Sequence, residues 1–116
     1  MIIVPIRTGL GLNSREHWRA KAKRAAAERR AVAWALLGTN RPALPCVVTL
    51  TRCGPSNGLD RDDNLPGSMK HARDQIAEWL GVDDRKRDIV RYEYRQARQK
   101  KWEVAIEFAP MPAGGV

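Results

Sequence analysis

The chain has 116 residues and carries 21 lysines and arginines against 13 aspartates and glutamates, a formal net charge of +8. This length is typical of one domain with a modest core, and a hydrophobic fraction of 43% excludes a wholly disordered chain. No apolar run approaches the ~20 residues of a membrane span, and no signal-peptide pattern opens the chain. We therefore expect a cytoplasmic protein with no membrane partner.

The first half of the chain predicts a strand, a long helix and a second strand. Residues 2–6 are rich in β-branched side chains and predict the first strand. Asn13 is expected to cap a helix that ends at Gly38. An apolar stripe at three- and four-residue spacing is expected along that helix, formed by Trp18, Ala22, Ala25, Val32 and Leu36. Residues 46–52 (CVVTLTR) predict a largely buried strand.

The second half predicts one further helix and two strands. Residues 63–66 (DNLP) favour a helix start, and Gly81 is expected to stop that helix. Residues 89–95 and 102–108 alternate as half-buried strands do, and the basic segment between them predicts a hairpin tip. We therefore predict a single α+β domain over residues 1–108, with a mixed β-sheet packed against two main helices in the order β-α-β-α-β-β. Residues 109–116 are expected to form a disordered tail.

The two cysteines, Cys46 and Cys53, are seven positions apart, and no histidine lies at ligand spacing from them. This pattern excludes a zinc knuckle and argues against a disulfide framework. We expect both residues to be reduced thiols on or beside a strand.

The charge of the chain is unevenly distributed. Residues 15–30 carry seven bases and two acids, and residues 85–101 carry eight bases and two acids. Residues 60–84, which lie between them, carry seven acids and only three bases. A basic surface is typical of proteins that bind the phosphate backbone, whereas clustered carboxylates repel phosphate unless a divalent cation lies between them. The pattern indicates a metal-dependent phosphodiester-cleaving site, unless the aspartates only cap helices and occupy loops.

The acidic segment also carries a motif. Residues 59–64 read LDRDDN, Lys70 and Asp74 lie four positions apart on the predicted helix, and residues 81–84 read GVDD. In this order the motif resembles that of the RusA family of Holliday-junction resolvases, which are typical of prophages. That family has D-x-D-N at the start of a helix, a lysine and then an aspartate four residues later, and a D-D pair after the helix. The resemblance extends over residues 2–108.

The resemblance implies Mg²⁺-dependent hydrolysis of DNA. Asp60, Asp63 and Asp84 would hold the metal, with Asp62 and Asp83 as alternative ligands. Lys70 would offset charge on the phosphate during cleavage.

Two features depart from the family pattern. Arg61 stands two positions before Asp63, where the family has an aspartate, and Lys70 follows Asn64 by six positions rather than three. On a continuous helix with about 100° per residue, Lys70 stays on the face that Asp63 begins. Asp74 either belongs to the site or forms an ordinary ion pair with Lys70.

Basic residues on both sides of the acidic segment are expected to contact DNA. They are Arg15, Arg19, Lys21, Lys23, Arg24, Arg61, Arg73, Arg98, Lys100 and Lys101. The four tryptophans (Trp18, Trp34, Trp79 and Trp102) are expected to be packing residues rather than base-stacking platforms. The two histidines (His17 and His71) are expected to have surface or core-packing roles rather than to catalyse.

The leading expectation is an endonuclease that resolves Holliday junctions in DNA recombination and repair. Resolution needs two symmetrical cuts, so a homodimer is expected. The alternative is a non-catalytic nucleic-acid-binding protein on the same fold, with a metal site impaired by Arg61. A small phage structural or adaptor protein would require the charge distribution to be accidental.

Overall fold

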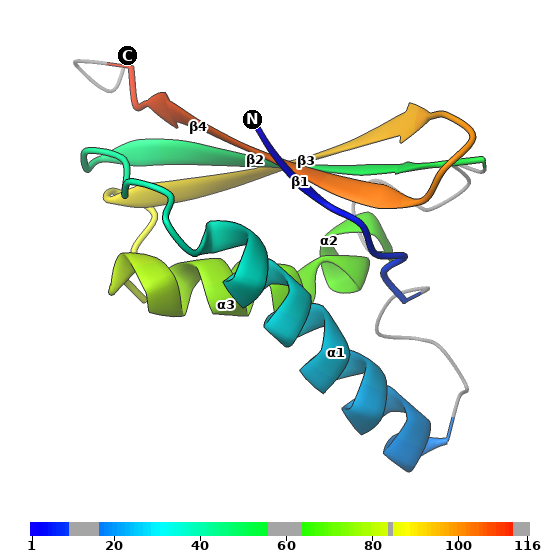
Figure 1. The fold of residues 1–116 in the computed structure, drawn as a ribbon. Coiled ribbons are helices and arrows are strands. Elements are labelled where there is room, and N and C mark those ends of the chain that lie inside the picture. The colour runs from blue at the N-terminus through cyan, green and yellow to red at the C-terminus, as the bar shows by residue number, and fades with distance from the viewer. Residues whose placement is uncertain (10–16, 56–63, 84, 113–116) are drawn as a thin grey trace.

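Within the part of the chain that the structure describes, four strands form one mixed sheet, and three helices cover one of its faces (Figure 1). The structure, a computed structural model, describes residues 1–9, 17–55, 64–83 and 85–112. In chain order the elements are β1 (Ile2–Val4), α1 (Trp18–Leu36), β2 (Cys46–Gly54), α2 (Asn64–Ser68), α3 (Lys70–Leu80), β3 (Val90–Arg98) and β4 (Glu103–Pro110). The predicted α+β class and element order are confirmed, with the second predicted helix divided into α2 and α3. β4 ends two residues beyond the predicted domain boundary, and residues 113–116 lie outside the described part of the chain.

The strand order in the sheet is β1-β4-β2-β3. β2 pairs in parallel with β3 and antiparallel with β4, and β1 pairs antiparallel with β4. The predicted hairpin of the last two strands is therefore wrong, because β2 lies between them. The two regions do form strands, but an alternating pattern does not show which other strand each one pairs with.

The connection from β3 to β4 crosses the carboxyl end of β2, and Gly54 makes this crossing possible. The ring of Trp102 lies so close to Gly54 that a Cβ atom there would overlap it. The Gln99 amide donates a hydrogen bond of 2.9 Å to the Gly54 carbonyl, which ties the connection to the strand that it crosses.

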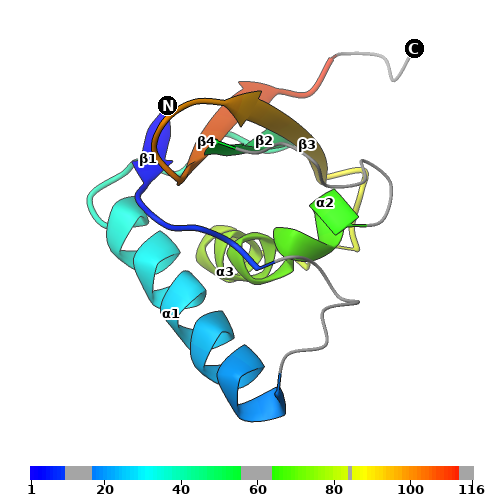
Figure 2. The same ribbon diagram turned by 90° about the vertical axis from the view of Figure 1, so that its right-hand side faces the viewer.

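The core lies between the sheet and the helical layer (Figures 1 and 2). Cys46, Val48 and Leu50 occupy alternate positions of β2, and all three are fully buried in the core cluster. The other members of the cluster come from the other three strands, from α1 and α3, and from Met69 between α2 and α3: Val4, Val32, Leu36, Met69, Ala72, Ile76, Leu80, Val90, Val104 and Ile106. None of the helices in the described ranges has the length and apolar character that a membrane crossing requires.

α1 differs from its prediction in where it begins and in which side chains it buries. It begins at Trp18, and His17 is its N-cap, with Nδ1 accepting a hydrogen bond of 3.2 Å from the Arg19 amide. Its buried residues all lie in the second half, whereas Trp18 and Trp34 are 66% and 69% exposed. The packing role predicted for these two tryptophans is therefore wrong. After Trp18, the first half consists of alanines and basic residues, so it offers no further large apolar side chain to anchor against the core.

The second predicted helix is interrupted at Met69. The Ser68 hydroxyl donates a 2.9 Å hydrogen bond to the Leu65 carbonyl, and the Met69 amide bonds the Pro66 carbonyl three residues back at 3.1 Å. Such bonds compete with the regular ladder of an α-helix, and α3 starts again at Lys70. The expected alignment of Lys70 with Asp63 assumed a continuous helix, so that argument no longer holds.

Both cysteines are free, buried thiols on β2, as the sequence predicts. Burial raises the pKa of Cys46, and burial together with the Glu103 carboxylate raises that of Cys53. A raised pKa disfavours the reactive thiolate, which agrees with a packing role for both side chains.

Candidate nucleic-acid interface

The predicted metal ligands Asp60, Asp62, Asp63 and Asp84 lie outside the described residues, as do Arg15 and Arg61. Their described neighbours can be placed. Asn64 begins α2 and Asp83 follows the end of α3, so these neighbours lie at opposite ends of the helical layer (Figure 1).

A groove of about 470 Å³ runs beside β3, from α2 to the turn that precedes the strand. We call it the basic groove, and its lining residues are Pro66, Arg73, Arg87, Val90, Arg91, Tyr92 and Tyr94. Pro66 lies three positions after Asp63, and Arg87 lies three positions after Asp84. The two parts of the acidic motif lie outside the described residues, but a described residue close after each part in the sequence lines this groove, together with Arg73 and Arg91.

Arg73 is the arginine that α3 contributes to the basic groove. Its Nη1 donates a 3.2 Å hydrogen bond to the Tyr94 hydroxyl, and its Nη2 lies 3.8 Å from Asp74 Oδ1. Arg87 and Arg91 are exposed on the other side of the groove, where Arg91 Nε lies 3.9 Å from Glu93 Oε1. One guanidinium group can donate hydrogen bonds to two phosphate oxygens at once, so this lining suits an anionic ligand.

Lys70 is an ion-pair partner of Asp74. Its Nζ lies 2.8 Å from Asp74 Oδ2, and the two side chains are 42% and 26% exposed. The ion-pair interpretation of Asp74 is therefore confirmed. An ammonium group has three donors, so this pair leaves Lys70 able to contact a phosphate as well.

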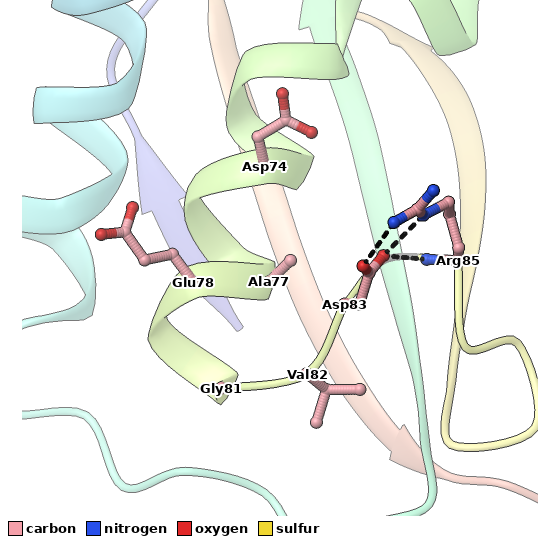
Figure 3. A pocket seen from close by; sticks show the side chains of 7 residues that line it. All are labelled: Asp74, Ala77, Glu78, Gly81, Val82, Asp83 and Arg85. Atoms are coloured by element: carbon pink, nitrogen blue, oxygen red, sulfur yellow. Dashed lines mark hydrogen bonds and ion pairs between the residues drawn. The ribbon is translucent and has the colours of Figure 1, made fainter.

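Asp83, the alternative metal ligand, is bound by Arg85 (Figure 3). The Arg85 guanidinium donates to the two carboxylate oxygens at 3.2 and 3.0 Å, and the Arg85 amide donates at 2.9 Å. Glu78 points away towards α1, where its carboxylate accepts a bond of 2.7 Å from Arg29. Within the described ranges, no three His, Cys, Asp or Glu side chains gather as a metal site requires.

The bases of residues 85–101 extend beyond the basic groove because β3 is an edge strand. Arg91, Arg95 and Arg98 are exposed along β3, and Lys100 and Lys101 are exposed on the connection that follows it. Arg98 is anchored by a 3.4 Å hydrogen bond from Nε to the Pro55 carbonyl. Three predicted DNA contacts, Arg98, Lys100 and Lys101, are thus exposed at the end of the strand that lines the groove and just after it.

A buried polar cluster closes the core near the carboxyl end of β2. Arg52 and Glu28 are each only 4% exposed. Arg52 Nε donates a 3.0 Å hydrogen bond to Thr8 Oγ1, and Glu28 Oε1 accepts one of 3.2 Å from the Gly9 amide. Burial lowers the pKa of Arg52, the charge of Arg7 lowers it further, and the Glu28 carboxylate raises it.

Trp102 covers this cluster. The Arg7 and Arg52 guanidinium carbons lie 4.5 and 4.6 Å from the centre of its ring, within the range of cation–π attraction. The same ring packs on Gly54, so the cluster joins the N-terminal segment, β2 and the crossing connection.

Sequence reasoning missed most of the residues that line the basic groove and form the buried cluster. Tyr92 and Tyr94 share a strand face within the basic run, but the groove exists only because α3 packs beside β3. Glu28 and Arg52 did carry a signal. Glu28 lies four positions before the buried residue Val32 and so on the same face of α1. Arg52 lies two positions after the buried residue Leu50 and so on the same face of β2.

Comparisons of the chain with protein-family models, curated proteins and solved structures found no match. The functional interpretation therefore depends on the motif and on the groove.

Proposed function

We propose that this chain is a Mg²⁺-dependent endodeoxyribonuclease of the RusA type that cleaves branched DNA, with Holliday junctions as its substrate. The observation that carries the proposal is the position of the basic groove. Its lining includes Pro66, three positions after Asp63, and Arg87, three positions after Asp84, together with Arg73 and Arg91. A phosphate bound there would lie beside residues that closely follow both acidic parts of the motif in the sequence.

We assign the side chains separate roles in phosphate binding, charge compensation and metal binding. Arg73, Arg87 and Arg91 bind backbone phosphates, and Lys70 offsets charge on the phosphate that is cut. Asp60, Asp63 and Asp84 supply the carboxylate oxygens that Mg²⁺ prefers, with Asp62 as the alternative ligand. When bound, Mg²⁺ would lower the pKa of a water molecule and stabilise the leaving oxygen.

The proposal includes a homodimer as its functional form. Resolution of a four-way junction needs cuts in two strands of like polarity, and a two-fold dimer supplies two symmetrical sites. Analytical ultracentrifugation of the protein alone and with a junction tests this assembly.

The test of the enzyme is cleavage of a labelled four-way junction with and without Mg²⁺. We expect paired nicks in Mg²⁺ and none in EDTA. Asp63→Asn should abolish the nicks while binding of the junction persists, because one carboxylate of the metal site is lost. Asp88→Asn is the matched control, since it makes the same change outside the motif and should cleave as the parent does. A junction that is bound but never nicked in Mg²⁺ or Mn²⁺ contradicts the proposal.

That contradictory result is the one that a second candidate function predicts. Asp74 is paired with Lys70, and Asp83 is bound by Arg85, so bases of the same chain neutralise two carboxylates of the acidic segment. Together with Arg61 in place of an aspartate, these pairs favour a protein that binds branched DNA without cutting it. The Mg²⁺ experiment separates the two functions.

A further inference from the structure

The first half of α1, residues 18–27, projects away from the sheet and from α3 (Figure 2). We call it the free half of α1. The residues that α1 buries, Glu28, Val32 and Leu36, all lie beyond it. Two of its ten side chains, Lys21 and Ala25, are half-buried, and the others are exposed. The free half therefore has a surface available to a partner on most of its sides.

The free half is basic throughout. It carries Arg19, Lys21, Lys23 and Arg24, and it contains no acidic residue. Its remaining residues are Trp18 and alanines, so small side chains separate the charges. Two such helices from two copies of the chain would repel each other, whereas a polyanion would be attracted. Charge complementarity thus favours nucleic acid over a second copy as the occupant.

Trp18 is the first residue of the free half, and it is 66% exposed although both of its chain neighbours contact its ring. The His17 ring stacks against it with a centroid distance of 5.8 Å and an interplanar angle of 28°. The Arg19 guanidinium carbon lies 5.2 Å from the centre of the Trp18 ring. The N-cap hydrogen bond from the Arg19 amide to His17 Nδ1 fixes the histidine in this arrangement.

We propose that Trp18 is a stacking platform for an unpaired base of DNA, and that the bases of the free half bind the phosphates on either side of it. A flat exposed ring beside positive charge is what single-stranded nucleic acid binds, because every base has a π-face and every linkage a phosphate. This inference deepens the proposed function, on which it rests for the choice of DNA as partner. Stacking of a base on Trp18 does not require that the protein cleave DNA.

The inference also defines a class of substrate. In a continuous duplex each base is already stacked on its neighbours, so its face is not available. Branch points, gaps and single-stranded segments expose base faces at little cost. Trp18 should therefore favour DNA with unpaired bases over a duplex of the same length, whatever its sequence.

The test is a binding titration in EDTA, where a Mg²⁺-dependent enzyme cannot cut. The probes are a duplex, the same duplex with a three-nucleotide gap at its centre, and one of its strands alone. Trp18→Ala should weaken binding to the gapped DNA and to the single strand by about 5- to 150-fold, the range expected for loss of one base stack. Duplex affinity should change by less than twofold. Trp18→Phe should retain most of the preference.

Trp34→Ala is the matched control, because Trp34 is as exposed as Trp18 and lies on the same helix. It should bind all three probes as the parent protein does. Equal effects of Trp18→Ala on gapped DNA and duplex, or no effect on either, would overturn the inference. A preference that depends on Trp18 without any junction cleavage would contradict only the nuclease. Cleavage with an unchanged preference in Trp18→Ala would contradict only the stacking platform.

Discussion

Glu28 and Arg52 are the two buried charged side chains of the described residues, and the Glu28 carboxylate interacts electrostatically with the Arg52 guanidinium. Glu28→Gln keeps an acceptor for the Gly9 amide but removes the charge that balances Arg52. An unbalanced buried cation costs about 3 kcal/mol or more, so we expect the free energy of unfolding in urea to fall by that amount. Glu107→Gln, at an exposed position of β4, should change it by less than about 0.5 kcal/mol.

The double variant Glu28→Gln/Arg52→Gln makes the prediction specific to the pair. Removal of both charges leaves no unbalanced ion, so the double variant should lose less stability than the sum of the two single variants. Strictly additive losses would show that the two charges do not interact.

His71 should make stability depend on pH. Partial burial lowers its pKa from the ordinary value of 6.5, the Lys70 charge lowers it further, and Asp74 partly opposes both effects. Below pH 6.5 the unfolded chain therefore binds a proton more readily than the folded chain does, and stability falls as the pH is lowered towards the folded pKa. Urea unfolding between pH 5.5 and 7.5 should show this slope in the parent protein and a smaller one in His71→Gln. An equal slope in both proteins would assign the dependence to other groups.

At the level of single residues, the sequence predicted well those pairs that depend on local spacing. The Lys70–Asp74 pair is one helical turn apart, so its formation needed no knowledge of the tertiary fold. The Arg52–Thr8 hydrogen bond spans 44 positions, and the Arg73–Tyr94 bond spans 21. Such contacts follow from the packing of the N-terminal segment and of α3 against the sheet, which no local pattern records.

The β3–β4 connection packs tightly on β2 where it crosses that strand, and among the described glycines Gly54 should tolerate a side chain least. In Gly54→Ala, the added methyl group overlaps the Trp102 ring, and relief requires a shift of that ring. Overpacking of this kind costs about 1–3 kcal/mol in urea unfolding. Trp102→Ala removes the obstacle, so Gly54→Ala should cost much less in that background. The same cost in both backgrounds would contradict the predicted overlap.

The elements themselves show what a one-dimensional pattern can predict. Strand alternation in β3 and β4 and the glycine stop of α3 were visible because they are local. The neighbour of each strand was not, because β2 inserts between two strands that are consecutive in the chain. The helical period of α1 was also visible, but the period alone does not show which part of a helix packs against the core. Trp18 fits the spacing of the stripe and is nevertheless exposed.

The basic groove is a property of the whole molecule. Arg73 belongs to the acidic segment of the chain, whereas Arg87 and Arg91 belong to the basic run that follows it. Their convergence follows from the edge position of β3 and the packing of α3 beside it. The sequence predicted the chemistry of the ligand, an anion in a basic surface, but not the place where the charges meet.

The salt dependence of DNA binding should report how many of these charges meet phosphate. The logarithm of the binding constant falls with the logarithm of salt concentration, with a slope of about −0.9 for each phosphate contacted. If Arg19 and Lys23 each contact one phosphate, Arg19→Gln/Lys23→Gln should reduce the magnitude of the slope by about 2. Arg29→Gln is the control, because Arg29 on the same helix bonds Gln75 and Glu78 and should leave the slope unchanged. A double variant with the parent slope would show that Arg19 and Lys23 do not contact the backbone, and would leave the basic groove and the exposed bases of β3 and its following connection as the described candidates for phosphate contact.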